Sequence, residues 1–251
     1  MLVSTNFERT TQVLSSGKNI IKGPLSSIWP RYLSPQVFYE TKASVRHFRS
    51  WLFERSKFRG RKALKLNIGC GANTAVGWIN IDLDGPPGIF RWDCRRGMPF
   101  DDNSVEVIFA EHVFEHFDPE SGLHFLIECH RCLQPGGIIR IIVPDAGKYL
   151  ELYRGDWSGF LPVRPLVEEN GTYRDHWLGR VYRTKMEFIN EVFRQGTEHK
   201  YAYDADTLMM KLGDAGFQRV IQQQYGVTAA NGAPLDTQSR SGESLYIEGI
   251  K

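Results

Sequence analysis

Short apolar segments recur along the middle of the chain, and each of them ends at glycine or polar residues. Five segments predict strands: LKLNIGCG at 64–71, WINIDLD at 78–84, FRWD at 90–93, VEVIFAEH at 105–112 and IIRIIVPD at 138–145. The last of these is apolar on both faces, as expected for a central strand of a parallel sheet. QRVIQQQYG at 218–226 and SLYIEGI at 244–250 predict two closing strands.

Helical periodicity predicts helices over 36–58, 119–133 and 204–217. In the first helix, the apolar residues close to one face are Phe38, Val45, Phe48, Trp51 and Leu52. The alternation of strands with helices predicts an α/β fold, a doubly wound, Rossmann-like and mostly parallel sheet.

The domain organisation follows from the same patterns. Residues 1–35 are polar and rich in proline, so we expect an irregular N-terminal arm before a single domain over 36–251. Residues 71–78 and 84–90 leave no room for a normal helix, and residues 36–63 are therefore predicted to cover the first half of the sheet. Residues 146–200 are rich in tyrosine, tryptophan and arginine and show no strand signal, which suggests an insertion or lid.

Candidate binding residues stand at the ends of the predicted strands, where ligands bind in such sheets. Gly69 and Gly71 allow a sharp turn and a close approach to a ligand, and the carboxylate of Asp82 can accept two ribose hydroxyls. A dinucleotide fingerprint needs a third glycine, where this chain has Thr74, and an acidic residue further along than Asp82. The spacing therefore argues against a dinucleotide site.

The ordered motifs resemble those of class I S-adenosylmethionine-dependent methyltransferases. The likeness rests on LNIGCG, NIDLD, DCRRGMPFDDNSVEVIFAEHVFEHF and LQPGGIIRIIVPD, and covers residues 64–145. Within that superfamily the chain is most similar to a compact bacterial branch often linked to polysaccharide and cell-surface glycan pathways. The resemblance implies the class I methyltransferase fold, with an antiparallel last strand, and S-adenosyl-L-methionine as cofactor, released as S-adenosyl-L-homocysteine.

The resemblance also implies a role for individual positions. Gly69 and Gly71 would border the methionine moiety, with Asn67 and Cys70 beside them. The remaining cofactor positions would be Asp82 at the ribose, Asp93 and Cys94 at the adenine, and Glu111 and His112 near the sulfonium.

Methyl transfer to a hydroxyl benefits from a general base, and the end of the fourth strand is rich in candidates. We expect His112 to serve as the base, with Asp145 as the second candidate. Further candidates are His176, His199, Tyr201 and Tyr203, in or beside the insertion. Glu115 and His116 complete an E-H-x-x-E-H pattern, but it lacks the H-E-x-x-H order and a clear third ligand, so no metal site is predicted.

Composition and charge narrow the remaining functions only slightly. The net charge of the 251 residues is +2, which gives no argument for a nucleic-acid partner. Basic residues concentrate in 42–65, where cover for the sheet is the favoured interpretation and a weak membrane-surface contact stays open. The four cysteines show no disulfide pattern, and with no signal peptide or transmembrane run we expect a cytoplasmic protein of unassigned oligomeric state.

The leading hypothesis is O-methylation of a small-molecule or glycan-type acceptor. One alternative is a methyltransferase acting on nucleic acid or protein, although no nucleic-acid module is visible. The other is a non-catalytic scaffold that binds S-adenosylmethionine.

Overall fold

The structure is a computed structural model that describes residues 35–232 and 234–251. The chain forms two compact units, residues 1–45 and 46–251. Helix α2 (Pro35–Phe53) begins in the first unit and ends in the second. The expected irregular arm over 1–35 lies outside the described residues except for Pro35, which starts the helix as proline often does.

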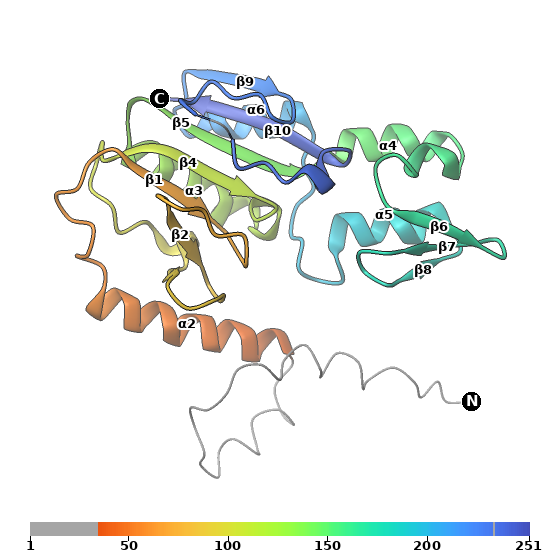
Figure 1. Ribbon diagram of the computed structural model, residues 1–251, viewed down its shortest axis with the longest axis horizontal. Helices are drawn as coiled ribbons and strands as arrows, with labels where there is room; N and C mark the ends of the chain where they lie inside the picture. The colour runs from red at the N-terminus through yellow and green to blue at the C-terminus, as the bar shows by residue number, and fades with distance from the viewer. Residues whose placement is uncertain (1–34, 233) are drawn as a thin grey trace, which may run out of the picture. The chain divides into compact units, whose positions relative to one another are not determined.

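The second unit is built on a seven-stranded sheet of order β3-β2-β1-β4-β5-β10-β9 (Figure 1). Its strands are β1 (Leu64–Ile68), β2 (Ile79–Asp82), β3 (Phe90–Arg91), β4 (Val105–Glu111), β5 (Leu133–Pro144), β9 (Arg219–Gln223) and β10 (Ser244–Ile250). The first five are parallel to one another, while β10 is antiparallel to both β5 and β9. The predicted fold class, a mostly parallel sheet with an antiparallel last strand, is confirmed.

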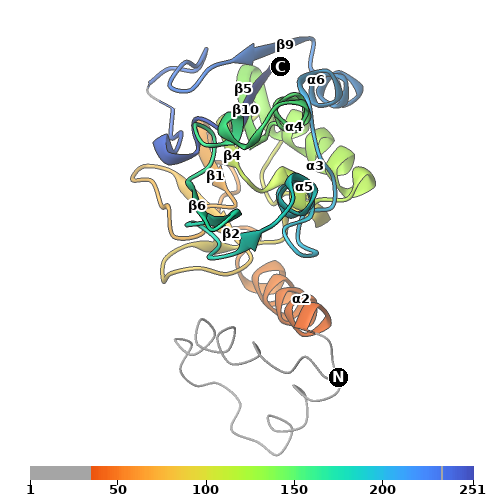
Figure 2. The ribbon, with the colours of Figure 1, turned by 90° about the vertical axis from the view of Figure 1, so that its right-hand side faces the viewer.

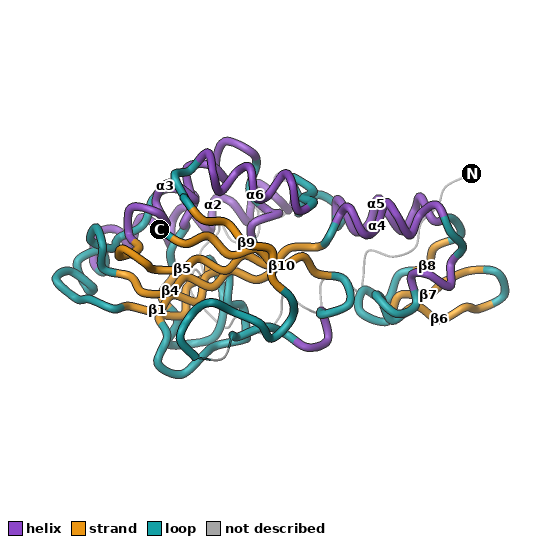
Figure 3. The backbone as a smooth tube through the Cα atoms, turned by 90° about the horizontal axis from the view of Figure 1, so that it is seen from above, coloured by secondary structure: helices purple, strands orange, loops and turns teal. Residues whose placement is uncertain are grey.

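Helices α3 (Pro119–Cys132) and α6 (Ala205–Asp214) lie side by side on one face of this sheet (Figures 2 and 3). Successive strand residues point to opposite faces, so Ile108 and Ala110 of β4 pack into the main core with these helices. Asp118 caps α3 by accepting hydrogen bonds from the backbone N–H groups of Glu120 and Ser121.

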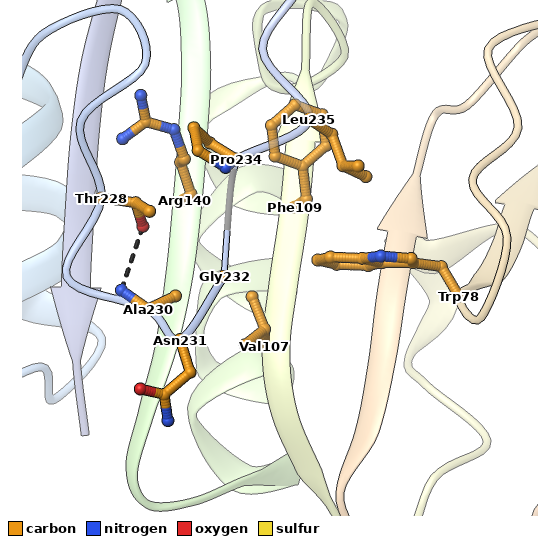
Figure 4. Close-up of a pocket in the computed structure, with 10 residues that line it drawn as sticks. All are labelled: Trp78, Val107, Phe109, Arg140, Thr228, Ala230, Asn231, Gly232, Pro234 and Leu235. Atoms are coloured by element: carbon orange, nitrogen blue, oxygen red, sulfur yellow. Dashed lines mark hydrogen bonds between the residues drawn. The ribbon is translucent and has the colours of Figure 1, made fainter.

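The other face of the sheet is covered by loops, and Phe109 of β4 packs there with Ile142, Tyr246, Trp78 and Leu235. The loop after β9 crosses this face and leaves a small cavity bordered by Trp78, Val107 and Phe109 (Figure 4). A buried guanidinium anchors that loop: Arg140 of β5 pairs with Asp236 at 2.6 Å and with Glu248 at 3.0 Å.

We expected residues 36–63 to cover the first half of the sheet. Phe58, which follows the helix, is buried against Phe90 of β3, but the described apolar side chains of α2 do not contribute to such a cover. Val45, Phe48, Trp51 and Leu52 are exposed. Within the second unit the polar face of α2 makes the contacts instead: Arg46 pairs with Asp84 at 2.7 Å and the His47 ring packs edge-on against Trp92. The apolar residues of α2 are thus spaced as on one helix face, but that face is exposed instead of packing on the sheet.

Residues 146–200 do contain strands, contrary to the prediction. The segment folds as α4 (Ala146–Arg154), α5 (Lys185–Arg194) and a three-stranded sheet of β6 (Leu166–Glu169), β7 (Thr172–Asp175) and β8 (Val181–Tyr182). It has its own apolar core around Tyr149, Phe160 and Phe188. The sequence held one signal: Asn170 and Gly171 both have positive φ, as a two-residue hairpin turn requires.

Short 3-10 helices complete the described part of the chain: η2 (Cys94–Arg96), η3 (Phe114–His116), η4 (Trp157–Phe160) and η5 (Gln238–Arg240). No helix among the described residues is long and apolar enough to cross a membrane.

Candidate functional site

The glycine turn after β1 lies directly against the end of β2. The backbone N–H groups of Gly69 and Cys70 donate to the Ile81 carbonyl at 2.8 and 3.2 Å, and Gly71 N–H donates to Asp82 Oδ2 at 2.7 Å. The structure therefore brings together the turn and the carboxylate that the sequence assigned to methionine and ribose recognition.

Asn67 shapes this turn from within the protein. Its side chain is buried, and its amide nitrogen donates to the Asn73 carbonyl and to Asn80 Oδ1, both at 2.9 Å. Asn80 in turn exchanges hydrogen bonds with the backbone of Ala75. The Asn67 amide nitrogen is thus engaged in positioning the loop.

Gly69 and Gly71 both have positive φ, but their surroundings differ. A Cβ on Gly69 would lie 2.6 Å from the Val113 side chain, whereas no described atom lies within 4 Å of a Cβ on Gly71. The close approach of Val113 by itself requires glycine at position 69, and the expected place of Gly69 beside the methionine moiety stays a prediction.

Alanine at these two positions is expected to destabilise the protein to different extents. Gly69→Ala should lower the free energy of unfolding by about 2–4 kcal/mol, because the left-handed conformation and the Val113 clash act together. Gly71→Ala should cost only about 1–2 kcal/mol of backbone strain. Urea denaturation of both variants measures the difference, and equal losses would contradict the assigned packing.

The side chains of Asp93 and Cys94, the expected adenine-binding residues, are engaged or buried within the protein. Asp93 is buried and its carboxylate accepts from the Arg95 side chain at 2.8 and 2.9 Å and from Arg96 at 3.2 Å. Burial acts to raise the pKa of Asp93, but the hydrogen bonds and charges of Arg95 and Arg96 outweigh it and lower that pKa. The Cys94 thiol lies in the main core, where burial raises its pKa.

Cys70 is buried beside the glycine turn. Burial, together with the nearby Asp82 charge, raises the pKa of its thiol to about 11. Its Sγ contacts the Gly71 carbonyl, so we assign it a packing contribution to the turn.

Glu111 and Asp145, at the ends of β4 and β5, are occupied by neighbouring backbone groups. Glu111 accepts from Thr237 N–H at 2.9 Å and from the Thr237 hydroxyl at 2.5 Å. Asp145 caps α4 by accepting from Lys148 N–H at 3.0 Å. Both carboxylates therefore hold local structure: Glu111 fixes Thr237, and Asp145 caps α4.

His112 follows β4 in the left-handed region, with φ of 52°, a conformation that histidine adopts more readily than most residues. Arg240 Nη1 lies 3.0 Å from His112 Nδ1, and His112 Nε2 lies 2.9 Å from Ser244 Oγ. A guanidinium can only donate, so Nδ1 must accept and the neutral ring carries its proton on Nε2. The unprotonated Nδ1 is the nitrogen suited to receive a proton.

The sequence did not single out Arg240 and Ser244, which contact His112, or Glu243, which pairs with Arg240. They reach the site because β10 is antiparallel, so its first residue lies beside Pro144, where β5 ends. Glu243 is buried and binds the Tyr149 hydroxyl at 2.9 Å and the Arg164 guanidinium. It thereby joins the insertion to the edge of the sheet.

Trp177 of the insertion also lies near Arg240, beside His112. Its half-exposed ring lies 4.5 Å from the Arg164 guanidinium and 5.8 Å from that of Arg240. Of the further base candidates, His176 is exposed and Tyr203 is buried in the main core, paired with Tyr201 at a ring distance of 4.9 Å.

Comparison with known proteins gives one family match, over less than half of the chain. Residues 84–141 match the family model described as a methyltransferase domain. No curated protein matches the sequence.

Several solved structures align with most of the chain at low sequence identity. The Burkholderia thailandensis 1,6-didemethyltoxoflavin-N1-methyltransferase, solved with bound 1,6-didemethyltoxoflavin and S-adenosylhomocysteine, aligns at 16% identity over 94% of this chain and 93% of that chain, with a TM-score of 0.44. A SAM-dependent methyltransferase from Archaeoglobus fulgidus aligns at 16% identity over 87% and 100%, with a TM-score of 0.44. A possible histamine N-methyltransferase from Thermotoga maritima aligns at 15% identity over 86% and 96%, with a TM-score of 0.44.

Proposed function

We propose that this chain is an S-adenosylmethionine-dependent methyltransferase that acts on an oxygen of a small-molecule or glycan-type acceptor. Its strand order and the match over residues 84–141 support a place in the class I methyltransferase superfamily. The acceptor class rests on the resemblance to the glycan-linked branch and on the half-exposed Trp177 ring near Arg240.

The observation that carries the proposal is the contact between the glycine turn and Asp82. Gly71 N–H and Asp82 Oδ2 are 2.7 Å apart at the carboxyl edge of the sheet, and the space at the Gly71 Cβ position is open among the described residues. This edge is where parallel sheets bind ligands. Backbone with no side chain in the way and a carboxylate for ribose hydroxyls therefore stand next to each other.

S-adenosylmethionine supplies an activated methyl group, so the protein's contribution is to position the acceptor and to remove its proton. In this proposal the acceptor hydroxyl takes the place of the Arg240 guanidinium at His112 Nδ1, and Nδ1 accepts the proton. Ser244 holds the ring by its contact with Nε2. Trp177 and Arg240 form the acceptor wall, where an aromatic face suits a sugar ring.

The other cofactor positions act through the turn and the strand ends. Asn67 and Cys70 position the glycine turn, while Asp93, Cys94 and Glu111 support the loops at the adenine and sulfonium ends. Asp93 N–H donates to His47 Nδ1 at 3.2 Å, so in this proposal it is the backbone N–H of Cys94 that reads the adenine edge.

Calorimetric titration of the full chain tests the proposal. S-adenosylmethionine and S-adenosylhomocysteine should each bind at one site with micromolar affinity, while NAD, the ligand of the dinucleotide fingerprint that this chain lacks, should not bind. Transfer of an isotopically labelled methyl group to nucleotide sugars and glycan lipids then tests the acceptor class. Absence of binding at millimolar cofactor would refute the proposed activity as a whole.

A further inference from the structure

A buried carboxylate without hydrogen-bond donors lies close to His112. Glu115 of η3 is 1% exposed, and among the described residues neither of its carboxylate oxygens has a hydrogen-bond partner. An ionised carboxylate removed from water needs a cation or several donors to offset its desolvation. Glu115 Oε1 instead faces imidazole nitrogens: His112 Nδ1 at 3.4 Å and His199 Nε2 at 3.8 Å.

His199 comes from the segment that joins α5 to α6, which runs to the carboxyl end of β4 (Figure 1). The backbone N–H groups of Lys200 and Tyr201 donate to the Glu115 carbonyl at 2.8 and 3.2 Å, which holds the two segments together. His116 completes the group, its ring lying edge-on to His199 with centroids 4.8 Å apart. One ligand atom from each of Glu115, His116 and His199 lies within 4.8 Å of the other two.

The tautomer of His199 leaves its Nε2 free to coordinate a metal ion. Its Nδ1 lies 2.8 Å from the Val192 carbonyl oxygen, which can only accept, so Nδ1 carries the ring proton. The neutral ring then directs the Nε2 lone pair toward Glu115 Oε1, and two acceptors face each other with no proton between them. A carbonyl that fixes the second nitrogen is the usual support for a metal-bound histidine.

We infer that Glu115, His116 and His199 form a binding site for a divalent transition-metal ion of the zinc type. Two imidazoles and one carboxylate are a donor set that zinc accepts, with a fourth position left for water. Zinc bonds of about 2.0–2.2 Å place tetrahedral ligand atoms about 3.4 Å apart. The present separations require the three side chains to close by about 1 Å, which side-chain rotation supplies.

The site ties the acceptor-side insertion to the catalytic edge of the sheet. Glu115 and His116 follow β4 directly, whereas His199 lies after α5 at the end of the insertion. A metal bound there fixes the segment before α6 relative to His112, whose ring touches Glu115. The sequence pattern did not reveal this site because the third ligand lies far along the chain, outside any local motif.

Metal analysis and zinc titration of the full chain, purified without an affinity tag, test this site. We expect one zinc per chain, measured by elemental analysis and by competition with a chromophoric chelator. Cobalt substituted for zinc should show the intense visible absorption of a four- or five-coordinate site. Neither readout depends on methyl transfer, so failure of the metal site and failure of the proposed function are distinguishable.

His199→Gln should weaken zinc binding by about 100-fold or more and remove the cobalt absorption, since a direct ligand costs more than an outer-shell partner. Glu115→Gln, which keeps the side-chain size, should do the same. His124→Gln is the matched control, because His124 is an exposed histidine of α3 outside the group. Zinc absent from the wild type, or bound by His199→Gln and Glu115→Gln as tightly as by the wild type and His124→Gln, would overturn the inference.

Discussion

Asp82→Ala is expected to lower the affinity for S-adenosylmethionine by about 100-fold. Hydrogen bonds to a charged group contribute about 1.5–3 kcal/mol each, and even part of two such bonds to the ribose hydroxyls amounts to this factor. The substitution also releases the turn, since Asp82 accepts from Gly71 N–H at 2.7 Å and from Asp84 N–H at 3.1 Å. Calorimetric titration of the variant with S-adenosylmethionine measures the loss.

Asp84→Ala is the matched control for this experiment. Asp84 also follows β2, but its carboxylate pairs with Arg46 at 2.7 Å on the outer side of the turn. We expect its removal to leave the cofactor affinity within about 3-fold, as for a partly exposed ion pair. Equal affinities of the wild type and Asp82→Ala would mean that the ribose site has been placed on the wrong residue.

His112→Asn is expected to lower kcat by about 10²–10⁴-fold while leaving cofactor affinity unchanged, because it removes the group that accepts the acceptor proton. Asparagine is preferred to alanine here, since His112 has a φ of 52° and asparagine tolerates the left-handed region. Steady-state kinetics on an acceptor found by screening, together with cofactor titration, measure both quantities.

Ser244→Ala provides the comparison for a positioning contact. It removes the hydroxyl 2.9 Å from His112 Nε2 but leaves Nδ1 in place, so kcat should fall by only about 10-fold. If His112→Asn retained wild-type kcat, His112 would not be the base, and positioning alone would account for catalysis. A large loss in Ser244→Ala with none in His112→Asn would also contradict the assignment.

The strands and the glycine turn could be predicted because their signals are local. Runs such as Ile138–Val143, apolar except for Arg140, must be buried on both faces. Asp82 stands at a strand end, where the topology alone brings it to the site. The three-stranded sheet of the insertion was missed because its strands are short and half-exposed, although Asn170-Gly171 marked one hairpin.

Other features depend on contacts between distant parts of the chain. Trp78 and Leu235, far apart in the sequence, pack together on the second face of the sheet. The residues around His112 are placed by the register between β5 and β10. Periodicity predicted a helix over 36–58, and the structure has one over Pro35–Phe53, followed by turns; periodicity could not say which face of the helix the fold buries. Residues Phe48 and Trp51 remain exposed, and the polar face makes the contacts.

The buried Glu243 links two loops to the start of β10. Arg164 of the insertion and Arg240 of η5 both pair with it, and breaking the buried Arg164 pair would cost about 3–5 kcal/mol. We therefore expect the insertion to move together with β10 rather than to open independently of it. If His112 is the base, we expect access to it to depend on rotation of the Arg240 side chain, which is 41% exposed.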